Sequence, residues 1–258
     1  MNRANFEIFE GDPESHVVLH VPHSSRVIPE AIREQLLLTD MELEAELDEM
    51  TDTSTDLLAS KAAAGARLRP WIFQNSLSRL VIDPERFPDE REAMNAIGMG
   101  AVYVKTSVGK KLRDIDTERD LRLIERYFYP YAAALELLTQ QVLTTHNRVT
   151  IIDVHSYRMR EHPNGINKGA KRPPVCIGVD NFHTPQWLRE LSIAAFSVLG
   201  EYVLNEPYVG TYVPLSFYES EPRVTSVMME NREDTILGEK LESAAGALSA
   251  LIDGIHQG

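Results

Sequence analysis

Three apolar runs of the sequence end in residues that can bind a metal ion or move a proton. The runs 16–23, 149–155 and 224–230 end in His23, His155 and Glu230. In open α/β sheets, ligands bind in the crevice at the carboxyl ends of the strands. Three strands with these endings would therefore bring two imidazoles and a carboxylate to one pocket. Imidazole and carboxylate groups are the usual ligands of a catalytic zinc ion, so the endings predict a metal-dependent hydrolase.

Both histidines have neighbours that fit metal binding. Asp153 lies two positions before His155, so both side chains project from the same strand face, and Asp153 can hold the second ring nitrogen of His155. His23 follows Pro22 in a predicted turn that presents its imidazole outward. The alternative is a set of structural histidines with ordinary hydrogen-bond partners. For His20, which precedes Pro22 inside the run, burial in a packed face is the preferred interpretation.

A catalytic zinc ion needs a third ligand, and the segment 51–58 offers two carboxylates. Asp52 and Asp56 lie about one helical turn apart, so either can reach the metal. The alternative is a helix N-cap or a solvated helix face. Hydroxyl-bearing residues around the pair distinguish it from an ordinary charged face.

Glu230 ends an apolar run, where a carboxylate without a partner is unfavourable. It therefore needs a metal ion, an arginine or a water molecule beside it. One interpretation is a general base that takes a proton from water. The other is a salt bridge with Arg232, two positions further on.

A candidate binding group for a substrate carboxylate lies in the segment 78–86. The run 77–82 is predicted as a strand, which places Arg79 and Asp83 on one face with Arg86 just beyond. Guanidinium groups bind carboxylates through two parallel hydrogen bonds, so Arg79 fits such a clamp. An ion pair between Arg79 and Asp83 is the structural alternative.

Composition restricts the possible partners and compartment. The 258 residues include 26 Lys and Arg against 39 Asp and Glu, a formal charge of −13, which argues against nucleic-acid binding. The single cysteine, Cys176, excludes an internal disulfide and a multi-cysteine zinc cluster. There is no apolar signal core and no apolar stretch of membrane-spanning length, so we expect a soluble, cytoplasmic protein without a membrane partner. The sequence leaves the oligomeric state open.

Strands alternate with helices along the chain, and the strands are too continuously apolar to have a wet face. This predicts one α/β domain, residues 1–258, with a mostly parallel or mixed twisted sheet covered by helices on both faces. The further expected elements are strands at 67–73 and 175–179 and helices at 40–64, 114–146 with a kink at Pro130, 185–199, and from an N-cap at Asp234 onward. The loop 162–174 follows a proposed ligand strand directly and is interpreted as an active-site loop.

As a set, these residues resemble the N-formylglutamate amidohydrolase family, which is similar to zinc carboxypeptidases and aspartoacylases. The matching segments span most of the chain: Pro22-His23-Ser24, 52–58, 78–86, 105–112, 153–156 and Glu230-Asn231-Arg232. Ser25 departs from the family, which usually has glycine there. Lys168, Lys171 and Arg172 lie in a loop that could select another substrate.

The resemblance implies one zinc ion per chain, bound by His23, His155 and a carboxylate from Asp52 or Asp56. Glu230 would be the general base and the later proton donor to the leaving amine. Substrate-binding candidates are Arg79, Arg86, Arg232 and Ser24, and supporting residues are Asp153 and Asp83. The implied reaction is hydrolysis of N-formyl-L-glutamate, a small acidic substrate, to formate and L-glutamate. The alternatives are a zinc peptidase or amidase acting on a peptide or cell-wall fragment, and a binding protein without turnover.

Overall fold

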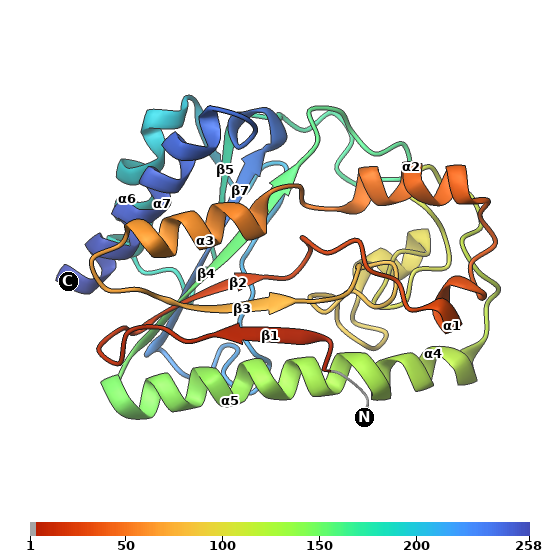
Figure 1. The fold of residues 1–258 in the computed structure, drawn as a ribbon, viewed down its shortest axis with the longest axis horizontal. Helices are drawn as coiled ribbons and strands as arrows, with labels where there is room; N and C mark the ends of the chain where they lie inside the picture. Colours follow the sequence, from red (N-terminus) through yellow and green to blue (C-terminus); the bar gives the residue numbers. More distant parts are fainter. Residues whose placement is uncertain (1–3) are drawn as a thin grey trace.

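The computed structural model describes residues 4–258, and its strands form one mixed, seven-stranded sheet (Figure 1). The strands are β1 (Phe6–Phe9), β2 (Val17–Val21), β3 (Trp71–Asn75), β4 (Val149–Tyr157), β5 (Val175–Gly178), β6 (Tyr202–Leu204) and β7 (Val224–Arg232). Their order is β1-β3-β2-β4-β7-β5-β6. The central strands β3, β2, β4 and β7 are parallel, while β1 and β5 run antiparallel to β3 and β7. The predicted sheet type is confirmed. The three apolar runs that the sequence analysis assigned to His23, His155 and Glu230 form the neighbouring strands β2, β4 and β7.

Helices cover both faces of this sheet. The α-helices of residues 4–258 are α1 (Glu30–Arg33), α2 (Asp40–Met50), α3 (Thr55–Gly65), α4 (Thr117–Leu123), α5 (Tyr129–His146), α6 (Gln186–Phe196) and α7 (Lys240–Gln257). Helices α3, α6 and α7 pack on one face and α5 on the other (Figure 1). All nine residues of β4 are buried, so the polar side chains of Asp153 and His155 are held inside the protein together with the apolar residues of the strand. Within residues 4–258, no helix has the length and apolar character needed to cross a membrane.

Strand register brings the marked residues together at the carboxyl end of the sheet. His20 of β2 is the register partner of Asp153 of β4, and His155 of β4 is the register partner of Glu230 of β7. His23 lies two residues beyond the end of β2. The buried strands therefore position these groups with little conformational freedom.

The predicted helix 40–64 is two helices, and the break between them carries Asp52. Ser54 adopts a left-handed conformation with φ of 66°, which interrupts the helix. The backbone amide of Asp52 donates to the carbonyl of His23 at 3.0 Å. Asp52 is therefore held beside His23, while Asp56 falls in the first turn of α3.

Three local predictions were wrong. The run 77–82 forms turns rather than a strand, because Ser78 accepts a backbone hydrogen bond from Val81 and its hydroxyl accepts another from Leu80. The helical segment ending at His146 changes at a π-helix, Ile124–Phe128, before Pro130 rather than at it. Asp234 does not cap α7; it lies in a 3₁₀ turn at 233–235 and pairs with Arg232.

Candidate active site

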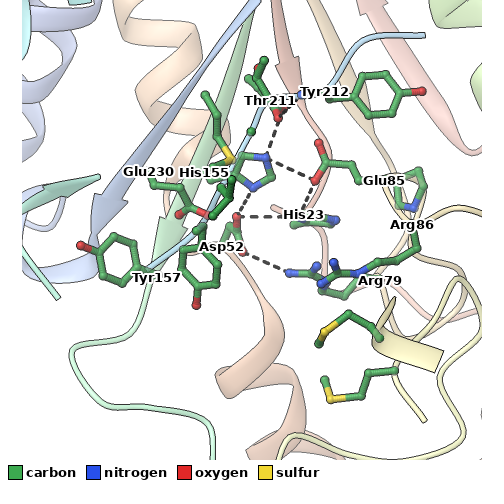
Figure 2. A pocket seen from close by; sticks show the side chains of 18 of the residues that line it. His23, Asp52, Arg79, Glu85, Arg86, His155, Tyr157, Thr211, Tyr212 and Glu230 are labelled. Atoms are coloured by element: carbon green, nitrogen blue, oxygen red, sulfur yellow. Dashed lines mark hydrogen bonds and ion pairs between the residues drawn. The ribbon is translucent and has the colours of Figure 1, made fainter. Parts of the chain in front are cut away.

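A cavity of about 840 Å³ opens at the carboxyl ends of β2, β4 and β7 (Figure 2). Its lining includes His23, Asp52, Arg79, Glu85, Arg86, His155 and Glu230. The loop 162–174 contributes His162, Lys168 and Arg172, so its predicted place at the pocket is confirmed. Most of the site residues predicted from the sequence therefore line one cavity.

His23 is held by one ring nitrogen and leaves the other facing the cavity. Its Nε2 lies 3.0 Å from Asp83 Oδ1, and its side chain is 2% exposed. Its Nδ1 has no hydrogen-bond partner among residues 4–258 and lies 3.6 Å from Glu85 Oε2. A carboxylate on the far nitrogen is the usual support for a metal-binding histidine.

His155 has the same arrangement with its nitrogens exchanged. Its Nδ1 lies 2.9 Å from Asp52 Oδ2, and its Nε2 faces Glu85 Oε2 at 3.3 Å and Asp153 Oδ1 at 3.1 Å. Burial alone would lower the pKa of His155, but the charges of Asp153 and Glu85 raise it well above its usual value. The surroundings of this ring therefore favour a positive charge.

Glu85 is the one residue in this cluster that the sequence reasoning did not single out. Its carboxylate lies between His23 and His155 (Figure 2), and its side chain is 16% exposed. His23, Glu85 and His155 form one group whose ligand atoms all lie within 4.8 Å of one another. The sequence feature that could have identified Glu85 is its position two residues after Asp83, within the candidate substrate-binding segment 78–86.

Four buried atoms around the cavity suit a positively charged group. Within the described chain, His23 Nδ1, His155 Nε2, Glu85 Oε1 and Glu230 Oε2 have no hydrogen-bond partner. We call these the open atoms. Two imidazole nitrogens and carboxylate oxygens are a donor set that fits zinc and other divalent transition metals. Leaving such atoms buried without partners is unfavourable, so the residues present fit a metal ion.

Glu230 lies on the β7 side of His155 (Figure 2). Burial raises its pKa to about 8; His155 opposes the shift, whereas the carboxylates of Asp52 and Asp153 add to it. The predicted alternative partner, Arg232, pairs instead with Asp234 at 2.6 Å. The Glu230 carboxyl is therefore a titratable group at the cavity wall.

Arg79 and Arg86 both line the cavity and both contact Asp83. Arg79 donates from Nε and Nη2 to Asp83 Oδ2 at 3.1 and 2.7 Å, so the ion pair between them is present, formed through a turn. Arg86 Nε lies 3.5 Å from the same oxygen. Burial would raise the pKa of Asp83, but Arg79 holds it well below its usual range. The two guanidinium groups form a cationic wall opposite Glu230.

Three predicted site residues lie elsewhere. Ser24 and Asp56 line a second cavity of about 660 Å³ and are not part of the first. Arg232 is also outside the first cavity and donates to Asp234 and to the carbonyl of Arg172. Asp52 is therefore the member of the Asp52/Asp56 pair that reaches the histidines.

Comparisons with known proteins agree with this architecture. The sequence profile of the N-formylglutamate amidohydrolase family matches residues 15–237. The chain belongs to this family. A structure of N-formylglutamate amidohydrolase from Ralstonia eutropha JMP134 superposes with a TM-score of 0.79 at 18% identity, over 99% of this chain and 98% of that one. The gene product Atu2144 from Agrobacterium tumefaciens superposes with a TM-score of 0.72 at 18% identity, over 97% and 94%.

No curated protein matches the sequence at a significant level. The two structural similarities, at this low identity, establish the α/β fold that the family shares. The family match identifies the protein as an amidohydrolase-type hydrolase.

Proposed function

We propose that the protein is a metal-dependent amidohydrolase that cleaves an N-acyl acidic amino acid, with N-formyl-L-glutamate as the first candidate. The observation that carries this proposal is the convergence of the open nitrogens of His23 and His155 on the Glu85 carboxylate, in a cavity that Glu230 also lines. Membership of the N-formylglutamate amidohydrolase family supports the choice of reaction.

The metal ion, expected to be zinc, would be bound by His23, His155 and Glu85. Asp52 Oδ2 lies 2.9 Å from Nδ1 of His155, the nitrogen opposite the open one, and 3.8 Å from the open Nδ1 of His23. The shorter contact favours support of the His155 ring over the ligand role expected from the sequence. When bound, a divalent cation there would polarise the amide carbonyl and acidify a water molecule. Asp83 would hold His23 in its binding orientation.

Glu230 would carry the proton transfers. Its open Oε2 accepts a proton from the attacking water and returns it to the amide nitrogen as the carbon–nitrogen bond breaks. The products are a carboxylic acid and a free amine. Arg79 and Arg86 would bind the carboxylate groups of the substrate, because they line the cavity beside Asp52 and Asp83, the carboxylates that hold the two histidines.

The size of the cavity favours a second candidate, a larger substrate. Cavities of roughly 300–1,000 Å³ typically enclose drug-sized ligands, and this one measures about 840 Å³. A longer acyl group or a short acidic peptide would use this space with the same metal and the same base. Lys168 and Arg172, on the loop 162–174, would then contribute to selectivity.

The test is release of free amine from a panel of N-acyl amino acids and acidic dipeptides, before and after chelation, with metal content measured on the same samples. Chelator-sensitive release of glutamate from N-formylglutamate would support the first candidate. Chelator-sensitive cleavage of only the longer substrates would move the proposal to the second. Asp56→Asn is a matched control for Asp52→Asn, because Asp56 lies outside the cavity and its replacement should leave turnover unchanged.

A further inference from the structure

The polar cluster extends inward from His23 and His155 to a second set of ligand-type residues. His20, Glu85 and Asp153 form another group whose ligand atoms lie within 4.8 Å of one another. His20 Nδ1 is 2.9 Å from Asp153 Oδ1 and 3.5 Å from Glu85 Oε1. We propose that these residues bind a second divalent cation, so that Glu85 bridges two metal ions. The inference rests on the proposed metal at His23 and His155 and extends it.

The three imidazoles share one design. Each ring has one nitrogen in a hydrogen bond with a supporting group, and its other nitrogen lies within 3.6 Å of Glu85. In His20 that second nitrogen, Nδ1, also hydrogen-bonds Asp153 Oδ1 at 2.9 Å, so it faces both carboxylates of the proposed second site. For His20 the support is the Tyr131 hydroxyl, 2.6 Å from Nε2, as Asp83 supports His23 and Asp52 supports His155. Such partners fix the ring orientation of metal ligands.

The β2 segment and β4 would each supply one ligand to each of the two ions. The β2 segment carries His20 and then His23, and β4 carries Asp153 and then His155. Because Asp153 and His155 are two positions apart, they lie on the same strand face. The deeper pair, His20 and Asp153, are register partners. The two ions would therefore sit one behind the other along the strand direction.

The carboxylate of Glu85 presents one oxygen to each group. Oε1 faces His20 Nδ1 at 3.5 Å, while Oε2 faces His155 Nε2 at 3.3 Å and His23 Nδ1 at 3.6 Å. Two-metal hydrolytic sites hold their ions about 3.5–4 Å apart, a spacing that one carboxylate can bridge. Asp153 has its other oxygen, Oδ2, bound by the backbone amide of Tyr212 at 3.3 Å. Its Oδ1 is thereby directed between the rings of His20 and His155.

The charge of the surrounding residues favours bound cations. The residues around the two proposed sites include five carboxylates (Asp52, Asp83, Glu85, Asp153 and Glu230) and two guanidinium groups (Arg79 and Arg86). With all seven groups charged and the imidazoles neutral, the formal excess is three negative charges. Both guanidinium groups lie against Asp83, so the excess falls on the side of the histidines. Burying like charges close together is unfavourable. One dication would leave a formal charge of −1 and two a formal charge of +1, so the excess favours bound cations without fixing their number.

The decisive measurement is the number and proximity of bound ions. Metal-free protein would be dialysed against Zn²⁺ for stoichiometry and titrated with Mn²⁺ under electron paramagnetic resonance. We expect two ions per chain and the spectrum of an exchange-coupled Mn²⁺ pair at saturation. A surface-bound Mn²⁺ ion would give an uncoupled signal, so the spectrum separates the proposed centre from adventitious binding. Two uncoupled ions would overturn the inference.

Two variants test the assignment of residues. His20→Ala should reduce the stoichiometry to one ion and abolish the coupled signal. Tyr131→Phe removes only the hydroxyl on His20 Nε2 and should weaken the second ion roughly 10- to 100-fold while leaving the first. It keeps the test usable if His20→Ala does not fold. Circular dichroism and thermal melting would verify folding in both.

The outcomes separate this inference from the proposed function. One ion per chain, with chelator-sensitive turnover and no change in stoichiometry in Tyr131→Phe, would overturn the second site and leave the amidohydrolase proposal standing. His20 would then be a hydrogen-bonding support for Asp153. Failure to bind any ion would overturn both proposals. Two coupled ions without hydrolysis of any substrate in the panel would support the second site and contradict the proposed reaction.

Discussion

Histidine clusters lie at both ends of the sheet, and their partners differ. At the carboxyl ends of the strands, His23 and His155 face Glu85 through open nitrogens. At the opposite end, His16 precedes β2 and His256 lies near the end of α7, with their Nδ1 atoms 3.2 Å apart. The Ser15 hydroxyl lies 3.2 Å from His256 Nε2. The second cluster therefore satisfies its nitrogens internally, whereas the first directs them into a cavity.

The difference in partners also reverses the direction of the pKa shifts. Nearby carboxylates raise the pKa of His155 well above its usual value, although burial opposes this. Burial lowers the pKa of His16 to about 4, and the neighbouring His256 and Arg148 add to the effect. A buried imidazole is thus suited to a cation when carboxylates surround it and to a neutral hydrogen-bonding role when they do not. Residue type alone does not distinguish the two ends.

The largest expected effects come from two substitutions at the carboxyl ends of the strands, one in a metal-binding residue and one in the residue that transfers the proton. His155→Ala should remove the metal and with it turnover. Glu230→Gln should keep the metal and lower kcat by about 10²–10⁴-fold, because the proton acceptor is gone. Metal analysis and kinetics on both variants test this division. Equal metal loss in the two would contradict it.

The next effect distinguishes Glu85 from Asp52, two of the carboxylates that contact His155. Glu85→Gln should weaken metal binding most, since Glu85 faces the open nitrogens. Asp52→Asn should weaken it only roughly 10- to 100-fold, the usual effect of losing a group that orients a ligand. Competition with a chelator of known affinity gives both constants. If Asp52→Asn lost the metal and Glu85→Gln kept it, Asp52 would be the ligand.

A smaller effect is expected from the cationic wall. Arg79→Lys should raise KM about tenfold for a substrate with a side-chain carboxylate and change kcat less, because an ammonium group cannot form the same paired hydrogen bonds. Arg232→Lys is the matched control, as Arg232 pairs with Asp234 outside the cavity. The check is steady-state kinetics on both. An unchanged KM in Arg79→Lys would remove that residue from substrate binding.

The strands of the site could be predicted from the sequence, because the residue pattern that indicates each strand lies within one short segment. Strands β2, β4 and β7 are largely apolar, and each is followed by or ends in a polar residue, so the residue pattern alone points to His23, His155 and Glu230. Parallel pairing then brings their ends together. The helices on both faces follow from the same burial of the strands.

The rest of the site depends on contacts between distant segments. Glu85 lies in an irregular region where the amide of Asp83 bonds to the carbonyl of Ala101, and no periodic pattern reports such a contact. Asp52 reaches His155 because its own amide bonds to the carbonyl of His23, a contact that also leaves Asp56 in a different cavity. The strand expected at 77–82 failed for a similar reason, since the hydroxyl of Ser78 stabilises a turn that apolar content does not reveal.

The smallest effect tests the other end of the sheet through stability. The pKa of His16 is about 4 in the folded protein against 6.5 as its ordinary value, so between these values the unfolded chain binds the proton more readily. This contribution to stability is complete above about pH 6.5 and declines as the pH falls towards 4. His16→Gln removes the titrating group and should flatten that part of the pH profile, measured as Tm in buffers between pH 7.5 and 4.5. The same substitution at the half-buried His146 is the control and should leave most of the wild-type slope, because His146 contributes least to the shift at His16. If His16→Gln retained the full slope, the acid sensitivity would belong to another half-buried histidine whose pKa burial lowers, such as His256.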